Sequence, residues 1–276
     1  MHLPHLFRSL ASSGALVGAV ACLFQVPPLW EQSTQALFLK AQSARDELHM
    51  FTVVVDAGHG GDDGGTKGGG IQEKDGTLDI ALRLEKTLLA RGVRVRMTRE
   101  DDHYLSLPDR CDIANGSRAD AFVSIHLNAS PGTDAAGIET YYSSKQKLAN
   151  AAALRQKIGV SAETEILDQR SAWLASCIQR RVGKVPDTND RGSRDSGFYV
   201  VKHTQCPAVL VECGYLTSTE EAAHLKSGAH RDHIASMIAD GVCQFLQASK
   251  LNPARGIIVG DGKVLPAGAD TRDAPD

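Results

Sequence analysis

Four side chains can bind a metal ion or move a proton: His59, His126 and Glu212, which follow short apolar segments, and Glu73, which lies just before a segment of helical periodicity. Two histidines and one carboxylate are the ligand set of many catalytic zinc sites, because they leave one position of the tetrahedral ion open for water. A further carboxylate that stays off the metal can take a proton from that water and pass it to a leaving nitrogen. The set therefore indicates metal-assisted hydrolysis of an amide bond.

Each of these residues also has a purely structural interpretation. His59 can be a turn residue, since four of the next six residues are glycines. Glu73 can stabilise a helix N-terminus through the helix dipole, and Glu212 can pair with a buried arginine. Only the joint occurrence of all four favours a site, and spacing alone does not bring them together. We expect Asp56 to orient a metal-bound histidine, and the glycines after His59 to let a substrate backbone approach the metal.

Short apolar segments alternate with segments of helical periodicity, which predicts an α/β fold in three layers: a mainly parallel twisted sheet with helices on both faces. The predicted strands are Phe51–Val55, Val93–Met97, Ala121–Ile125, Ile138–Tyr142 and Ala208–Val211. The predicted helices cover residues 77–91, 108–117, 172–182 and 230–246. In such sheets functional groups gather beyond the carboxyl ends of the strands. His59, His126 and Glu212 all follow predicted strands, so we expect them at one edge.

The two ends of the chain differ in composition from the middle. Residues 1–24 combine Arg8, an uncharged stretch and an Ala-Val-Ala sequence before Cys22, which indicates a signal peptide or an N-terminal anchor, and leaves lipidation of Cys22 as an alternative. Residues 25–50 are expected to be a tether, 51–248 the catalytic domain and 249–276 a disordered or loosely docked tail. A net charge of -3 gives no attraction to nucleic acid. We expect an exported protein of the periplasm or cell envelope.

Several sequence blocks together resemble the zinc-dependent N-acetylmuramoyl-L-alanine amidases, over about residues 52–246. They are VVVDAGHGG (53–61), the Glu-Lys-Asp at 73–75, TREDDHYLSLPDRCDIAN (98–115), ADAFVSIHLNAS (119–130) and PAVLVECGYLTSTEEAAHL (207–225). The resemblance implies a phosphorylase/hydrolase-like fold and hydrolysis of the bond between muramic acid and L-alanine in peptidoglycan. It implies that His59, Glu73 and His126 bind Zn²⁺, that Glu212 is catalytic, and that an activator protein is a possible partner.

The resemblance also suggests substrate-binding or supporting roles for Asn128 and Arg191. The residues after Arg191 depart from the family pattern, which affects the expected substrate preference. Some relatives carry an inhibitory helix in the region of residues 144–170, where Glu163 and Glu165 could reach a metal. Two other functions remain open from the sequence: a zinc peptidase that cuts elsewhere in the stem peptide, and a wall-binding module without turnover. The second has no use for a general base.

Overall fold

The computed structural model describes residues 48, 50–132, 135–146, 151–252, 256–260 and 263–264. The chain divides into two compact units, residues 1–44 and 45–276, and every described residue belongs to the second. The predicted signal peptide or anchor and most of the predicted tether therefore lie outside the described residues. Within the described part of the chain, no helix is both long and apolar enough to span a membrane.

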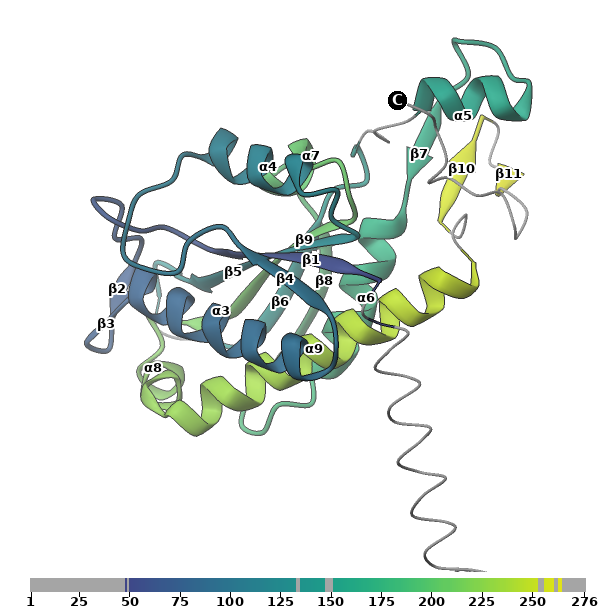
Figure 1. Ribbon diagram of the computed structural model, residues 1–276. Coiled ribbons are helices and arrows are strands. Elements are labelled where there is room, and N and C mark those ends of the chain that lie inside the picture. Colours follow the sequence, from purple (N-terminus) through teal and green to yellow (C-terminus); the bar gives the residue numbers. More distant parts are fainter. Residues whose placement is uncertain are drawn as a thin grey trace, which may run out of the picture. The chain divides into compact units, whose positions relative to one another are not determined.

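A six-stranded sheet forms the centre of the fold, with the strand order β4-β1-β5-β9-β6-β8 (Figure 1). Its strands are β1 (Thr52–Ala57), β4 (Arg94–Met97), β5 (Ala121–Asn128), β6 (Ile138–Tyr142), β8 (Asp190–Asp195) and β9 (Ala208–Tyr215). The first four in the spatial order are mutually parallel. β6 runs antiparallel to β9 and parallel to β8, so the sheet is mixed but mostly parallel.

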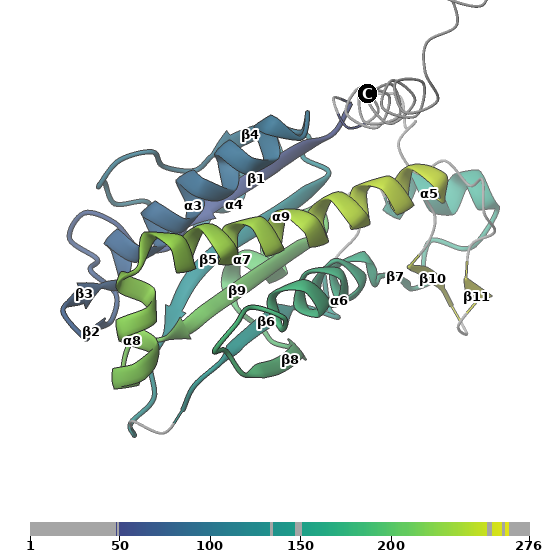
Figure 2. The ribbon, with the colours of Figure 1, turned by 90° about the horizontal axis from the view of Figure 1, so that it is seen from below.

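Helices cover both faces of this sheet. One face carries α3 (Glu73–Ala90), α6 (Arg170–Val182) and α9 (Gly228–Leu251), and Figure 2 shows α9 between the other two. The opposite face carries the shorter α4 (Leu107–Gly116) and α7 (Tyr199–His203). Each face has its own buried apolar cluster, as expected for a sheet that alternates its side chains between two helical layers. The predicted three-layer α/β fold is confirmed.

All five predicted strands and all four predicted helices are present, together with several short elements that were not predicted. The edge strand β8 has the sequence DRGSRD and no apolar side chain, so it carries no hydrophobic pattern. Two short helices, α7 and α8 (Thr219–Lys226), precede and follow β9 in the sequence. The helix α3 begins at Glu73, four residues before the predicted start, directly after the hairpin of β2 (Lys67–Gly68) and β3 (Ile71–Gln72).

A second, three-stranded sheet has the order β11-β10-β7, from β7 (Ile166–Asp168), β10 (Ile257–Val259) and β11 (Lys263–Val264). The helix α5 (Ala151–Ile158) packs on it through a small apolar cluster that contains Leu154, Ile166 and Ile257. This small sheet was not expected for the segment before α6 or for the predicted C-terminal tail. The segment before α6 folds with the C-terminal region, and residues 257–259 of the predicted tail form a paired strand.

The α6–α9 contact depends on a glycine. A Cβ atom built on Gly241 of α9 would lie 2.5 Å from Cα of Ile178 in α6. We expect Gly241→Ala to force these backbones apart and to lower the free energy of unfolding by about 1–3 kcal/mol. Urea denaturation measures this. Gly116→Ala is the control, because nothing lies within 4 Å of a Cβ there; an equal loss in both variants would contradict the close-packing explanation.

Candidate metal centre

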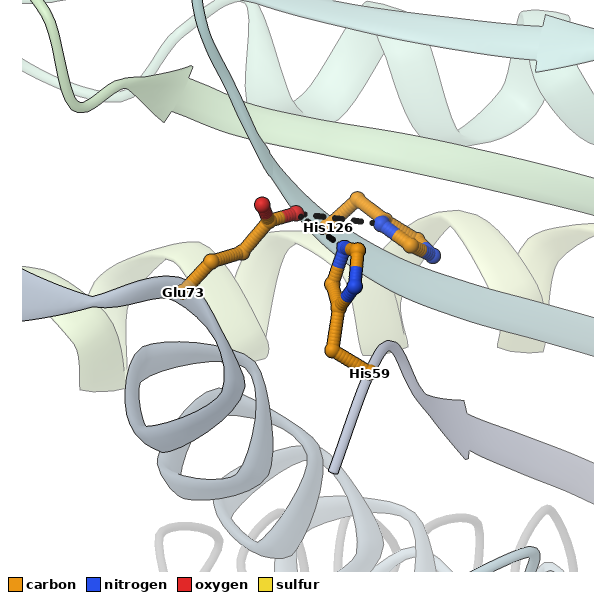
Figure 3. A group of neighbouring side chains, drawn as sticks. All are labelled: His59, Glu73 and His126. Atoms are coloured by element: carbon orange, nitrogen blue, oxygen red, sulfur yellow. Dashed lines mark hydrogen bonds and ion pairs between the residues drawn. The ribbon is translucent and has the colours of Figure 1, made fainter. Parts of the chain in front are cut away.

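Three predicted ligands meet at the carboxyl end of the parallel strands. Oε1 of Glu73 lies 3.0 Å from Nε2 of His59 and 3.1 Å from Nδ1 of His126 (Figure 3). The two imidazole rings approach edge to face, with centroids 4.9 Å apart. One donor atom from each residue lies within 4.8 Å of the other two. In the described part of the chain this is the one cluster of its kind, and it joins β5, the N-terminus of α3 and the loop after β1.

Glu73 is held from several sides although it is only 4% exposed. Its Oε2 accepts a hydrogen bond from the backbone N–H of Thr66 at 2.8 Å, and its Oε1 accepts one from Leu127 N–H at 3.1 Å. Burial by itself raises the pKa of this carboxyl, but hydrogen bonds from His126 and His59 outweigh burial and hold the pKa well below its usual value. As the first residue of α3, the carboxylate also lies at the favourable end of the helix dipole.

His59 adopts a left-handed backbone conformation, with φ of 61°, which is uncommon outside glycine. Its Nδ1 lies 2.9 Å from Oδ2 of Asp63, so the carboxylate fixes the ring and leaves Nε2 facing Glu73. A carboxylate on the far nitrogen of a ligating histidine is typical of metal sites. Asp63 was not predicted for this role. Its spacing of four residues from His59 was the available sequence signal.

Two buried arginines fix the backbone that presents His59. Arg99 donates to the carbonyl oxygens of Ala57 at 2.9 Å and Gly58 at 2.8 Å. Arg110 donates to the carbonyls of Ala57 at 2.6 Å and His59 at 2.7 Å. Three successive carbonyls thus receive guanidinium hydrogen bonds, which satisfy these backbone acceptors at the end of β1. We infer that these bonds stabilise the left-handed conformation of His59.

The prediction for Asp56 was wrong, because this carboxylate does not contact a histidine. It is fully buried and lies 2.7 Å from Nη1 of Arg110, and it accepts hydrogen bonds from Ser124 and Thr98. Burial raises the pKa of Asp56, but Arg110 and the two hydroxyls bring it below the usual value. Asp56 therefore compensates the charge of Arg110, and Asp63 has the orienting position that was expected of Asp56.

The glycines around His59 have a steric role in the site that was not predicted. A Cβ atom on Gly65 would lie 2.6 Å from Oε2 of Glu73, and one on Gly60 would lie 2.2 Å from the carbonyl of His103. Gly58, just before His59, would meet the His126 ring at 2.5 Å. These glycines therefore make room for the ligands and for a neighbouring loop.

Glu212 lies beside the cluster on β9. It is the direct register partner of His126 on β5, and parallel partners project to the same face about 4.8 Å apart. Its Oε2 is buried and has no hydrogen-bond partner among the described residues. Burial raises the pKa of Glu212 to about 7; the charges of Glu73 and Glu139 add to the effect, and His126 opposes it. A carboxyl group with this pKa can accept and return a proton near neutral pH.

Comparison with known proteins agrees with this arrangement. The sequence profile described as N-acetylmuramoyl-L-alanine amidase matches residues 53–244. The chain belongs to this amidase family. It is 34% identical over 194 residues to N-acetylmuramoyl-L-alanine amidase LytC of Bacillus subtilis, and the match covers 70% of this chain but only 35% of LytC. The chain thus spans about a third of that relative.

Solved amidase structures show the same fold. The amidase AmiC2 of Nostoc punctiforme is 33% identical with a TM-score of 0.61, and the match covers 71% of this chain and 97% of AmiC2. The CwlD amidase of Clostridioides difficile, solved in complex with the GerS lipoprotein, is 31% identical with a TM-score of 0.61, and the match covers 72% of this chain and 99% of CwlD. Both matches support the three-layer α/β architecture of the amidase domain.

The two remaining candidate residues of this amidase domain meet at a residue that was not predicted. Nδ2 of Asn128 donates to Oε1 of Glu139 at 2.9 Å, and Nε of Arg191 lies 3.4 Å from Oε2 of the same carboxylate. Both side chains thus converge on Glu139, and neither belongs to the cluster of His59, Glu73 and His126. A glutamate between Ile138 and Thr140 in a predicted strand was the sequence signal for this buried charge.

The segment considered as an inhibitory lid lies elsewhere in the amidase domain. Ser171, which follows β7 closely, accepts a hydrogen bond from Ala208 N–H at the start of β9, and Arg170 pairs with Asp168 at 2.7 Å. These contacts place the described residues 166–171 at the amino end of β9, whereas Glu212 is near its carboxyl end. Figure 1 shows α5 and β7 on the side away from the β2–β3 hairpin. The described part of the segment does not cover the metal centre.

The structural role of Asp56 is testable by Asp56→Asn. We expect the free energy of unfolding to fall by about 3–5 kcal/mol, because the charge of Arg110 is left buried without compensation. The measurement is urea denaturation with a chelator present, so that metal affinity does not contribute. Asp101→Asn, which alters an exposed pair with His103, is the control and should change little. Unchanged stability of Asp56→Asn would contradict the structural role.

Proposed function

We propose that this chain is a zinc-dependent amidase that hydrolyses the bond between N-acetylmuramic acid and L-alanine in peptidoglycan, in wall turnover or cell separation. The observation that carries the proposal is the convergence of His59, Glu73 and His126 beside Glu212, whose carboxyl group is buried and has a pKa near neutrality. Membership of the amidase family supports the choice of bond. The relatives named above carry the same activity in their names.

The donor set fits zinc. Two imidazole nitrogens and one carboxylate oxygen are its usual ligands in catalytic sites, and two ligand atoms at about 2.0–2.1 Å from a tetrahedral ion lie roughly 3.3 Å apart. The observed 3.0 and 3.1 Å between Glu73 Oε1 and the two histidine nitrogens are close to this value. Glu73 is already ionised in this environment, so it does not have to lose a proton to bind a cation. A fourth ligand position would be left to solvent or substrate.

Each residue then has a defined part in the reaction. A zinc ion held by His59, Glu73 and His126 would supply a Lewis acid that polarises the scissile carbonyl and makes water more acidic. Glu212 takes a proton from the attacking water and returns it to the leaving nitrogen of L-alanine, so that the C–N bond breaks and a free amine departs. Asp63 holds the His59 ring in the tautomer that exposes Nε2.

The location and partners of the protein are part of the proposal. We propose export to the periplasm or cell envelope, with residues 1–24 as signal peptide or anchor, because peptidoglycan lies outside the membrane. Residues 51–248 would form the catalytic domain. The CwlD amidase was solved with a lipoprotein partner, and this supports an activator protein as a possible partner here.

Digestion of purified muropeptides tests the reaction. We expect the zinc-loaded protein to release stem peptides that begin with L-alanine, identified by mass analysis, and Glu212→Gln to retain zinc but to lose roughly 100-fold or more in rate. The glutamine keeps the shape of the side chain and removes its basicity. Release of peptides cut at another bond would instead identify a zinc peptidase. Full activity of the variant would remove Glu212 from the mechanism.

Zinc titration tests the ligands separately from turnover. We expect His126→Ala to lose tight zinc binding, and Asp63→Asn to lower the affinity by about 10–100-fold, because the ring of His59 loses its charged partner. The asparagine can still accept the hydrogen bond from Gly65 N–H, so the loop is preserved. Asp62→Asn is the matched control one residue away and should bind zinc like the unaltered protein. Unchanged affinity in Asp63→Asn would disprove its role.

A further inference from the structure

A second group of polar side chains lies next to Glu212, on the side away from His126. We call it the Glu139 cluster; it contains Asn128, Glu139, Arg191, Arg194 and Tyr215. Glu139 is 1% exposed and is the direct register partner of Glu212 across the antiparallel pair β6–β9. Partners in such a pair project to the same face of the sheet. The cluster therefore borders the proposed general base, and its residues Glu139 and Arg194 have none of the roles assigned above.

The two oxygens of Glu139 face different partners. Oε1 accepts hydrogen bonds from Asn128 Nδ2 at 2.9 Å and from Tyr215 OH at 2.7 Å. Oε2 lies 3.1 Å from Nε of Arg194 and 3.4 Å from Nε of Arg191, yet no well-aligned hydrogen bond to it forms within the described residues. One carboxylate thus faces two guanidinium groups, so the Glu139 cluster itself carries a net positive charge.

The two arginines are held to different degrees. The guanidinium of Arg191 lies over the Tyr215 ring, 5.1 Å from its centroid, and Nη1 donates to the carbonyl of Ala136 at 3.4 Å. The side chain of Arg194 is 51% exposed, and in the described part of the chain its one ion-pair partner is Glu139, reached through Nε. That contact is made through Nε, and the two terminal nitrogens belong to a side chain that is half exposed. Such a pair of N–H groups matches the two oxygens of a carboxylate.

The sheet geometry gives the distance between Arg194 and the proposed general base Glu212. Arg194 on β8 pairs with Tyr141 on β6, and β6 lies next to β9, which carries Glu212. Two strand spacings of about 4.8 Å place β8 roughly 10 Å from β9, and Tyr141 also pairs with Leu210, two residues before Glu212. The backbone of Arg194 therefore lies about 12 Å from that of Glu212, which an extended peptide spans with about three to four residues. Resting on the proposed function, we propose that Arg194, backed by Arg191 and Glu139, binds a carboxylate of the stem peptide close after the scissile bond.

Paired substrates test this site in the full chain. The probes are N-acetylmuramoyl-L-alanyl-D-glutamate and the same compound with both glutamate carboxyl groups converted to amides. We expect Arg194→Gln to lower kcat/KM about tenfold for the acid and less than twofold for the diamide, because only the acid loses a charge-assisted hydrogen bond. Arg194→Lys should recover part of the loss on the acid, since it restores the charge without the planar pair of donors.

Arg96→Gln is the matched control. Arg96 is exposed on β4, at the opposite edge of the same sheet, and its substitution should leave both substrates unchanged. An equal loss on acid and diamide in Arg194→Gln, or no loss on the acid, would overturn the carboxylate site. Thermal melting of all variants checks that the fold is retained.

Calorimetry separates failure of this proposal from failure of the proposed function. The acid and the diamide are titrated into the Glu212→Gln protein, with and without Arg194→Gln. We expect tighter binding of the acid, and loss of that preference when Arg194 is replaced. If the unaltered protein hydrolyses neither compound nor any muropeptide, the amidase proposal fails, while a preference for the acid that depends on Arg194 still supports the site. Equal binding of acid and diamide would refute it.

Discussion

The centre of this protein depends on one buried carboxylate. Oε1 of Glu73 lies within hydrogen-bond distance of both histidines and of the backbone of Leu127, so one oxygen links a loop, a helix N-terminus and a strand. An ionised group with so little exposure is stable only if every neighbour supplies a donor or a positive charge. The glycines around it follow from the same constraint, since a side chain at Gly58 or Gly65 would occupy the space of the ligands.

Charge compensation continues outward from that carboxylate in two directions. On one side, Arg99 and Arg110 bind the carbonyls of the His59 loop, and Asp56 compensates the charge of Arg110. On the other side, Glu139 gathers two arginines beside Glu212. The first arrangement is closed and almost fully buried, which suits a role in positioning. The second is open to solvent at Arg194, which suits contact with a ligand.

The two helical layers explain why the site lies where it does. Glu212 and Glu139 project to the face that carries the short α4 and α7, as do Phe122 and Leu210 in the apolar cluster of that face. The long α3, α6 and α9 cover the other face. Polar side chains at the carboxyl ends of β5 and β9 therefore project to the less extensively covered face. Their position at the carboxyl ends of the strands agrees with the position of functional groups in open α/β sheets.

Hydrophobic period and strand length were enough to predict the α/β class, the five apolar strands and the four main helices, because burial of an apolar face determines these locally. The pairing of His59, Glu73, His126 and Glu212 was expected from strand exits and from family motifs. Only the tertiary structure decided which side chains each carboxylate contacts. Asp63 and not Asp56 contacts His59, and Glu139 contacts both Asn128 and Arg191. β8 and the β7–β10 pair were not predicted, because β8 has no apolar side chain, β7 and β10 have three residues each, and all three strands gain stability from partners distant in the chain. Ion pairs and edge strands depend on neighbours in space, and a linear pattern does not record them.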